Sequence, residues 1–215
     1  MEQNVQLLGV FGDDLTVVNA ARVSFDKEST EMTEKDAKLI KYLAKHHHIS
    51  PFFHPQIRFR IKMPIFVARE WYRHQIGFAR NEVSRRYVDS PPEFFLPNAC
   101  EIRQRDPNLK QGSMSNCSCH SEESYQVMSN AMAHANMAYQ NLLDQDVAPE
   151  VARMILPQSM MTEFIETGSL AAYARLCNLR LDPHAQKEIR DYAGLISEIL
   201  ATKFPVSWAA LMASV

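Results

Sequence analysis

The sequence predicts an α+β fold: a single helix-rich domain over residues 1–215 with a small mixed or antiparallel sheet. Most segments with a clear apolar period repeat at the spacing of a helix. A few segments alternate with period two or favour β-structure, and these cannot all pair as simple hairpins. No internal repeat or Gly/Ser-rich linker divides the 215 residues. One core of ordinary size is within reach of a chain of this length.

The first half of the chain shows three helices and one strand. Asp13 and Asp14 give an acidic start to a short helix along LTVVNAARVSF. Thr33 opens a second helix, TEKDAKLIKYLAKHH, and stands at capping-box spacing from Asp36. The stretch QIRFRIKM alternates apolar and polar side chains, which predicts a strand with one buried face. Pro64 suits the first turn of the next helix, PIFVAREWYRHQIG.

The second half alternates helices with short strands. EFFL favours a short strand, whereas residues 98–121 have no apolar period and predict a loop. A helix of roughly twenty residues follows Ser121, and Pro149 begins the short helix PEVARMIL. MMTEFIETGS favours a strand and SLAAYARLCNL a helix. Asp182 and Pro183 then cap and start a long helix, and FPVSWAALMA forms the last one.

Composition and charge restrict the class of protein. Hydrophobic residues make up 46% and charged residues 22%, which is typical of a folded chain. The net charge of −2 and the pI near 6.4 argue against a nonspecific binder of nucleic-acid polymers. No stretch approaches the roughly eighteen apolar residues of a membrane span, and MEQNVQLLGVFGDD lacks the pattern of a secretory signal. Four cysteines without a regular framework favour a reducing, cytoplasmic setting.

The stretch RHQIGFARNEVSRRYVD, which starts at Arg73, is the strongest candidate for a binding site. Its four arginines fall within residues 73–86, a window that contains one acid, Glu82, and no lysine. Guanidinium groups are planar forks that bind phosphate or carboxylate through paired hydrogen bonds. Ser84 and Arg86 are spaced so that both could face one anion. The alternatives are an arginine-rich surface turn and an internal ion-pair network of Glu82 with Arg85 or Arg86.

Two further arginines lack a simple structural explanation. Arg153 lies in PEVARMILP, which is otherwise apolar. It either carries its charged end to the surface or meets an anion bound by a neighbouring subunit. Arg180 in CNLRLDPHAQKEI precedes Asp182, and a helix cap at Asp182 explains neither Arg180 nor His184.

The sequence carries no motif for a metal or a phosphate-binding loop. The histidines at 46–48 are adjacent and so point in different directions on a helix, and CSCH at 117–120 lacks a second pair of ligands. We therefore predict no metal site. G-x-G-x-x-G, G-x-x-x-x-G-K-[ST] and G-x-S-x-G are absent, so we expect side chains to bind the anions. Covalent catalysis through Ser or Cys is disfavoured for the same reason.

Together these segments resemble the flavin-dependent thymidylate synthases. The signature of that family is roughly R-H-R-x-x-S-x-N-E-x-S-x-R-Y, and here it stands as RHQIGFARNEVSRRY. The matching residues are Arg73, His74, Asn81, Glu82, Ser84, Arg86 and Tyr87. AARVSFD, KHHHISPFFH, PIFVAREWYRH, PEVARMILP and NLRLDPHAQ also look like family segments in family order. The resemblance covers most of residues 10–205.

The resemblance implies the fold of that family and a homotetramer with shared active sites at subunit interfaces, each binding FAD. It implies that a one-carbon unit passes from methylenetetrahydrofolate to C5 of dUMP, giving dTMP, while NADPH reduces the flavin. The expected partners are small molecules and other copies of the chain, not a nucleic-acid polymer or a membrane.

Site residues carry over by position in the family pattern. For dUMP the resemblance implies Glu70, Arg73, Glu82, Val83, Ser84, Arg85, Arg86, Arg153 and Arg180, with Arg153 supplied by another subunit. For FAD it implies Ser24, His48, Ser50, Arg73, His74, Gln75, Arg80, Asn81, Glu82, Ser169 and Arg175. Arg180 is the implied catalytic residue, because a guanidinium near N3 of the pyrimidine favours the ionised ring that makes C5 nucleophilic.

The sequence departs from the family pattern in ways that bear on the reaction. Gln75 replaces the second arginine of the signature, and the spacer IGFAR is one residue longer and lacks its serine. Arg80, in this spacer, could restore the lost charge. Glu70 stands where many relatives have Gln. Two alternatives therefore stay open: a flavin- and folate-dependent hydroxymethylase of a pyrimidine nucleotide, and a nucleotide-binding homologue without catalysis.

Overall fold

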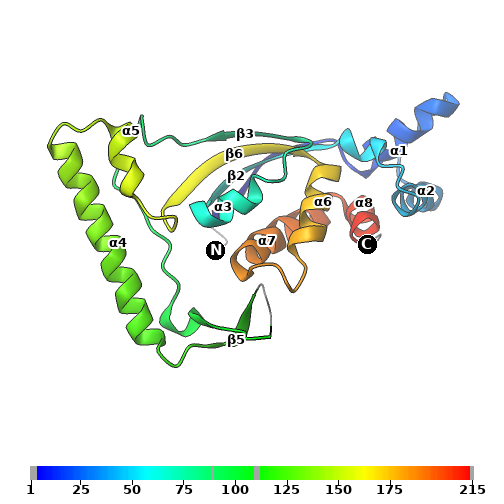
Figure 1. Cartoon of the computed structure of the whole chain (residues 1–215). Coiled ribbons are helices and arrows are strands. Elements are labelled where there is room, and N and C mark those ends of the chain that lie inside the picture. The colour runs from blue at the N-terminus through cyan, green and yellow to red at the C-terminus, as the bar shows by residue number, and fades with distance from the viewer. Residues whose placement is uncertain (1–3, 89, 109–111, 214–215) are drawn as a thin grey trace. The chain divides into compact units, whose positions relative to one another are not determined.

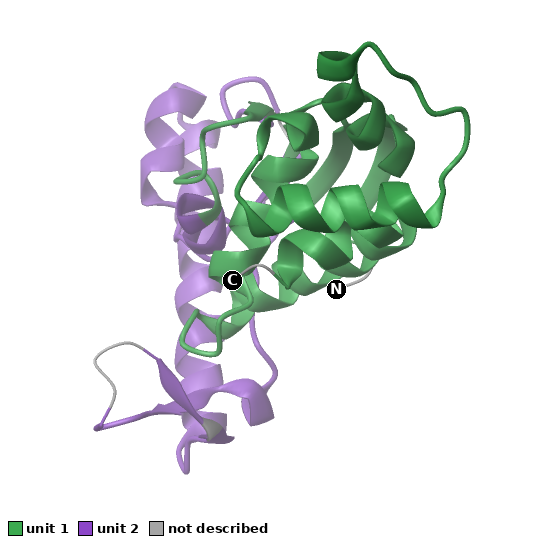
Figure 2. Ribbon diagram, turned by 90° about the vertical axis from the view of Figure 1, so that its right-hand side faces the viewer, with its two compact units in different colours: residues 1–61, 71–81, 164–215 green, residues 62–70, 82–163 purple. Residues whose placement is uncertain are grey.

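The computed structural model describes residues 4–88, 90–108 and 112–213 (Figure 1). The chain divides into two compact units (Figure 2). Unit 1 contains residues 1–61, 71–81 and 164–215, and unit 2 contains residues 62–70 and 82–163. No helix in the described ranges is both long enough and apolar enough to cross a membrane.

A four-stranded sheet has the strand order β1-β2-β6-β3. The strands are β1 (Val5–Phe11), β2 (Gln56–Pro64), β6 (Met161–Ser169) and β3 (Phe78–Glu82). β1 and β2 are antiparallel, with Val5 opposite Ile61 and Phe11 opposite Gln56. The combination of this small sheet with many helices confirms the predicted α+β class. The prediction of a single domain stays a prediction.

Strand β2 has the one buried face that the alternation of apolar and polar residues predicted. Ile57, Phe59, Ile61 and Met63 are all fully buried, and the residues between them are more exposed. Successive side chains of a strand point to opposite faces, so the alternation seen in the sequence becomes one buried and one wetter face.

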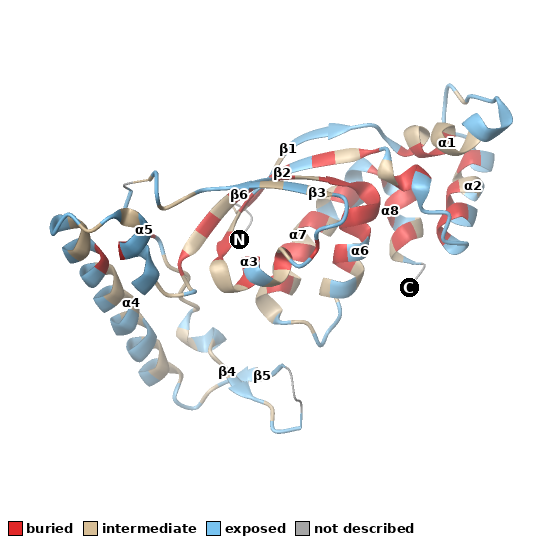
Figure 3. Ribbon diagram, turned by 45° about the horizontal axis from the view of Figure 1, so that its top comes forward, coloured by how far each residue is buried: buried red, intermediate tan, exposed pale blue. Residues whose placement is uncertain are grey.

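Unit 1 contains most of the buried apolar side chains, as the red segments of α6 and α7 show (Figure 3). Its helices are α1 (Asp14–Arg22), α2 (Glu34–Lys45), α6 (Leu170–Arg180), α7 (Lys187–Lys203) and α8 (Pro205–Met212), with 3₁₀ turns η2 (Val23–Phe25) and η3 (Ser50–Phe53). The Asp14 carboxylate is buried and accepts the backbone N–H groups of Val206 and Ser207 at 2.9 and 2.8 Å. It thereby satisfies donors at the start of α8 that would otherwise have no partner.

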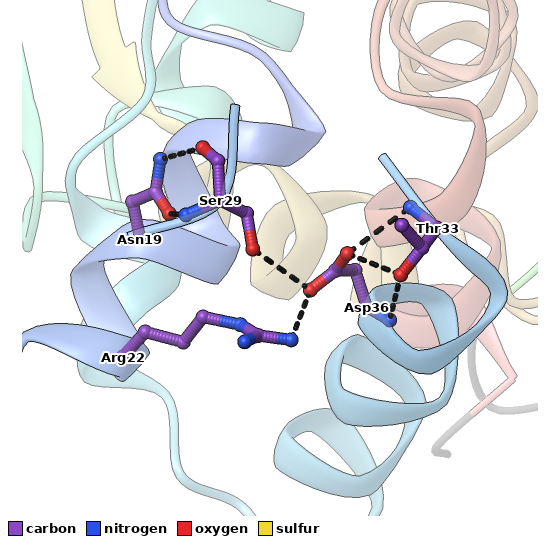
Figure 4. A network of polar contacts seen from close by, with 5 residues as sticks. All are labelled: Asn19, Arg22, Ser29, Thr33 and Asp36. Carbon is purple, nitrogen blue, oxygen red and sulfur yellow. Dashed lines mark hydrogen bonds and ion pairs between the residues drawn. The ribbon is translucent and has the colours of Figure 1, made fainter. Parts of the chain in front are cut away.

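A polar network centred on Asp36 joins α1 to α2 (Figure 4). Thr33 caps α2 in a capping box with Asp36, as predicted. The Asp36 carboxylate, which is 1% exposed, also meets Arg22 at 2.5 Å and Ser29 at 3.3 Å. Asn19 exchanges two hydrogen bonds with the backbone of Ser29. Hydrogen bonds from Thr33 and the charge of Arg22 lower the pKa of Asp36, so the carboxylate is ionised at neutral pH.

Unit 2 is built around the 24-residue helix α4 (Ser121–Asp144). Tyr139 is the buried residue of this helix. The remaining elements of the unit include α5 (Pro149–Ala152), the 3₁₀ turns η4 (Ala99–Glu101) and η5 (Arg153–Ile155), and the antiparallel strands β4 (Arg103–Arg105) and β5 (Ser113–Cys117). Helix α3 (Ile65–Trp71) begins in unit 2 and ends at Trp71, which belongs to unit 1.

The structure differs from the sequence-based expectation in several places. Strand β1 was not predicted, and EFFL forms only an isolated bridge between Phe94 and Met160. Residues 98–121 contain β4 and β5, although part of this stretch, 109–111, lies outside the described residues. Helix α3 ends at Trp71, and the second part of the arginine-rich motif forms strand β3. Asp182 does not cap α7; its carboxylate accepts the N–H of His184 at 2.7 Å in a turn that precedes the helix.

Candidate functional site

Residues 72–77 connect α3 to β3 and carry the first residues of the family signature. The side chains of Arg73 and Gln75 are exposed, whereas His74 between them is 9% exposed. Gly77 has a positive φ of 83°, and a Cβ at this position would lie 2.9 Å from Ala172 in α6. Only glycine fits this turn without strain, since both the backbone conformation and the close approach exclude a side chain. The turn therefore lies directly against α6.

Helix α6 holds this turn through three hydrogen bonds. Arg175 donates from Nη2 to the carbonyl oxygen of Ile76 at 2.5 Å. The N–H of Ser169 donates to the carbonyl oxygen of Gly77 at 3.1 Å. Arg180 donates from Nε to Nε2 of His74 at 3.0 Å. Two arginines whose roles the sequence left open thus meet the signature segment.

The contact between Arg180 and His74 fixes the protonation of the histidine. An arginine side chain can only donate, so Nε2 of His74 must be the acceptor and the ring proton is on Nδ1. Burial, together with the charges of Arg180, Arg175 and Arg80, lowers the pKa of His74 from 6.5 to about 4. His74 is therefore neutral at physiological pH and offers one donor, Nδ1–H, to a ligand.

A buried carboxylate, Glu166 of β6, lies beside the same segment and was not found from the sequence. Glu166 is fully buried and accepts hydrogen bonds from Nε1 of Trp71 at 3.1 and 3.2 Å and from Nε of Arg80. The Arg80 guanidinium also lies 4.6 Å from the ring centroid of Phe78 and 5.4 Å from that of Tyr72. Nη2 of Arg80 is buried without a hydrogen-bond partner in the described residues. The signal that could have found Glu166 is its place in the buried register of β6, two residues after Phe164.

The other FAD residues implied in unit 1 are mostly exposed. Ser24, His48, Ser50 and Asn81 all have exposed side chains. The His48 ring lies near the rings of Tyr42 and His46, which gathers three aromatic rings at the end of α2. Ser169 is instead buried, and its Oγ accepts the N–H of Ala172 as the N-cap of α6.

In unit 2 the segment from Ser84 to Tyr87 forms a tight turn. The N–H of Tyr87 donates to the carbonyl oxygen of Ser84 at 3.0 Å, and the N–H of Arg86 donates to its Oγ at 3.3 Å. Arg86 is exposed and donates to the Tyr87 hydroxyl at 2.8 Å. Its guanidinium also lies 5.1 Å from the Tyr87 ring centroid. The turn thus presents a hydroxyl and an exposed guanidinium two residues apart, which suits a phosphate.

The internal ion-pair network that was an alternative for this motif is not seen. Glu82 accepts a hydrogen bond from Oγ1 of Thr162 at 2.5 Å, and Arg85 donates to the carbonyl oxygens of Ser90 and Pro91. Among the residues that the structure describes, no ion pair joins Glu82 to Arg85 or Arg86. Arg86 is therefore available to an external anion.

The remaining dUMP residues of unit 2 lie on several elements. Val83 is exposed and donates its N–H to the carbonyl oxygen of Glu163 at 2.9 Å. Arg153 begins η5 with an exposed side chain, and Glu70 in α3 is partly exposed. Arg153 therefore carries its charge to the surface, which fits both of the interpretations considered for it.

Two other kinds of site are not supported. Within the described ranges, no group of three or more His, Cys, Asp or Glu side chains could hold a metal ion. A shallow groove of about 380 Å³ lies along α7, and its lining includes Leu181, Arg190 and Glu198. None of the predicted site residues lines this groove.

Comparisons with known proteins find the same family that the signature residues resemble. The family described as thymidylate synthase complementing protein matches residues 6–206. The flavin-dependent thymidylate synthase of Thermus thermophilus is 41% identical over 207 residues, which cover 96% of this chain and 74% of that protein. The enzyme of the same name from Thermosipho melanesiensis is 38% identical over 206 residues, with 94% and 86% covered.

A solved structure shares the fold over nearly the whole chain. The UMP/dUMP methylase PolB from Streptomyces cacaoi, bound with 5-Br dUMP, superimposes with a TM-score of 0.87 at 31% identity. The match covers 97% of this chain and 94% of that one. The chain belongs to the flavin-dependent thymidylate synthase family, a family of methyltransferases.

Proposed function

We propose that the protein is a flavin-dependent thymidylate synthase that transfers a one-carbon unit from methylenetetrahydrofolate to C5 of dUMP, giving dTMP, with NADPH as the reductant. The observation that carries this proposal is the signature segment itself: exposed Arg73, Gln75 and Arg86 together with the neutral His74 that Arg180 holds. Relatives that match this chain over most of their own length are named for the same activity. They favour methyl transfer over the hydroxymethylase alternative.

The residues of unit 1 fit the chemistry of a flavin dinucleotide. A flavin offers carbonyl oxygens and a diphosphate, which need donors and positive charge. The turn that α6 holds supplies the Arg73 and Gln75 side chains and the Nδ1–H of His74. We assign FAD binding to these residues with Ser24, His48, Ser50, Asn81 and Arg175, and less directly to Arg80 and Ser169, whose polar groups already have partners. When bound and reduced by NADPH, the flavin would supply a hydride to the one-carbon unit.

The residues of unit 2 suit the phosphate of a nucleotide. Ser84, Arg86 and the N–H groups of their turn are proposed to bind the dUMP phosphate, and Arg153 of a neighbouring subunit to complete the site. Arg85 and Val83 shape the backbone of that turn, and Glu82 and Glu70 are proposed to meet the sugar.

Arg180 is proposed to act on the pyrimidine ring. C5 of uracil becomes nucleophilic when the ring carries negative charge, and a fixed guanidinium near N3 stabilises that charge. The hydrogen bond to His74 leaves Arg180 with a defined orientation before any substrate binds, so little reorganisation is needed. No protein nucleophile is required in this scheme.

The exposed apolar side chains of unit 2 support a homotetramer. In α4, Val127 is 68% exposed and Met137 is 58% exposed, and Met154 of η5 is 78% exposed. Exposed apolar side chains of this kind are typical of a subunit interface. The four free cysteines support a reducing, cytoplasmic setting.

The test is a product analysis. Purified protein is incubated with FAD, NADPH, methylenetetrahydrofolate and dUMP, and the nucleotide product is weighed by mass spectrometry. We expect the mass of dTMP; a product heavier by one oxygen would establish the hydroxymethylase, and no product from a protein that binds dUMP but no FAD would establish the non-catalytic homologue. A parallel reaction with UMP is included because the matched PolB structure is that of a UMP/dUMP methylase. Conversion of UMP alone would overturn the assignment of dUMP.

A further inference from the structure

One buried carboxylate, that of Glu166, contacts both ends of residues 71–80, the stretch that carries the first part of the signature segment. Trp71 is the last residue of α3, and Arg80 lies in the middle of β3. Both donate to Glu166 of β6, the first through Nε1 and the second through Nε. The residues between them include Arg73, His74 and Gln75, which are proposed to bind FAD. A single side chain therefore closes the loop that carries these three residues.

Because the Glu166 carboxylate is buried, its contacts with Trp71 and Arg80 are costly to break. Glu166 is fully buried, and the Arg80 side chain is only 15% exposed. Burial raises the pKa of Glu166, and the Arg80 charge and the N–H donors of Arg80 and Trp71 oppose this shift. Removing one partner of such a pair leaves the other charge buried without compensation, so the two side chains hold each other in place.

The surroundings of Glu166 leave it little freedom to change partners. Tyr173 of α6 lies close to it, and burial together with the Glu166 charge raises the pKa of Tyr173 well above its usual value. Tyr173 packs against Phe59 and Phe78 with ring centroids 5.4 and 4.9 Å apart. Phe78 in turn supports the Arg80 guanidinium. The carboxylate is therefore surrounded by closely packed aromatic side chains that restrict its movement.

Helix α6 and its N-cap Ser169 hold the middle of the same loop, at His74, Ile76 and Gly77, whereas Glu166 holds its two ends. The positions of the two loop ends set the direction in which the Arg73 and Gln75 side chains point. We propose that Glu166 is a positioning residue for FAD: through Trp71 and Arg80 it sets the geometry of the flavin-binding loop without touching the flavin. This inference rests on the proposed function for its cofactor and on the hydrogen bonds from Trp71 and Arg80 to Glu166 for its geometry. It also gives Arg80 a role within the protein, where the sequence had suggested a replacement charge for Gln75.

The experiment compares Glu166→Gln with Glu198→Gln, which makes the same change at an exposed position of α7. Glutamine cannot accept hydrogen bonds on both terminal atoms and leaves Arg80 without a counter-ion. In the apo protein we expect faster hydrogen–deuterium exchange in residues 72–77. We also expect a change in Trp71 fluorescence, read in a Trp208→Phe background because the chain has two tryptophans. The FAD dissociation constant should rise by on the order of tenfold, which corresponds to about 1.4 kcal/mol.

Glu166→Asp is the second variant, because it keeps the charge and both acceptors and remains informative if Glu166→Gln does not fold. Its shorter side chain should give a smaller change of the same sign in exchange, fluorescence and FAD affinity. Exchange of residues 72–77 and FAD affinity within twofold of wild type in a folded Glu166 variant would overturn the proposal. So would a lower melting temperature with unchanged FAD affinity, which is the result for a purely structural residue. If the wild-type protein binds no FAD, the proposed function fails, whereas exchange and fluorescence still decide whether Glu166 orders the loop.

Discussion

The two compact units use their charged side chains in opposite ways. In unit 1, Asp14, Asp36 and Glu166 are buried, and each accepts hydrogen bonds from identified donors. In unit 2, Arg86 and Arg153 are exposed, and neither forms an ion pair among the described residues. Buried charges are tolerated only with fixed partners, so those of unit 1 specify its conformation. The exposed arginines of unit 2 are available to ligands, so they contribute little to stability.

The apolar side chains repeat this contrast. Helix α6 is largely buried and α7 buries one face, whereas α4 is largely exposed (Figure 3). A substitution in unit 1 should therefore appear first as a loss of stability or of a preset geometry, and one in unit 2 as a loss of binding. The predictions below test this difference.

The largest effect is expected for Arg180→Ala. This substitution removes a guanidinium proposed to stabilise charge that develops during the reaction, so kcat should fall by about 10²- to 10³-fold, as for other groups of this kind. The affinity for dUMP should change much less. Steady-state kinetics and equilibrium binding measure the two quantities, with Lys203→Ala, at an exposed position of α7, as the control. An equal loss in binding and in turnover would show that Arg180 acts only by holding the nucleotide.

Asp36→Asn is expected to have the largest effect on stability. The substitution leaves Arg22 without its counter-ion and weakens the capping box with Thr33. The free energy of unfolding should decrease by about 3 kcal/mol. Chemical denaturation measures this value, and Glu34→Gln, an exposed acid of the same helix turn, is the matched control and should change it by less than about 0.5 kcal/mol. Similar values for the two variants would contradict the assignment of Asp36 as the centre of the network.

The pKa of His74 predicts a pH dependence of stability. The folded state holds this pKa at about 4, below the usual 6.5. As the pH falls from 6.5 to 4 the unfolded chain binds a proton at His74 before the folded chain does, so stability decreases over this window. The resulting decrease in the free energy of unfolding is about 2 to 3 kcal/mol, and it does not increase further below pH 4.

The matched comparison for this effect is between His74→Asn and His134→Asn, a change at an exposed histidine of α4. Unfolding measured from pH 7 to pH 4 should show a shallower pH dependence for His74→Asn and a wild-type dependence for His134→Asn. A wild-type slope in both variants would mean that His74 is as readily protonated in the folded protein as in the unfolded chain.

Arg86→Ala should give the smallest of these effects and should leave stability unchanged. Loss of a charge-assisted hydrogen bond to the phosphate should weaken dUMP binding by about 1.5 to 3 kcal/mol. The free energy of unfolding should stay within about 0.5 kcal/mol of wild type, because Arg86 is exposed. Isothermal titration and denaturation give the two numbers, with Arg105→Ala as an exposed control in the same unit. An unchanged dissociation constant would remove Arg86 from the phosphate site.

The sequence by itself determined the elements with a strong local signal. Each of these signals involves residues only a few positions apart. They are the alternation in β2, the capping box at Thr33, and the prolines at the starts of α5 and α8. The resemblance to the family likewise rests on short segments, and the comparisons confirm it. Such features depend on backbone geometry and nearest neighbours, which a single segment contains.

Only the tertiary structure decided which distant residues meet. That Arg180 holds the ring of His74, and that Trp71 and Arg80 share Glu166, follows from the packing of α6 and β6 against residues 71–81. No spacing in the sequence encodes these contacts, because they join residues roughly a hundred positions apart and depend on which groups burial leaves without water. The physical reason is that a buried charge must find a partner wherever the fold brings one.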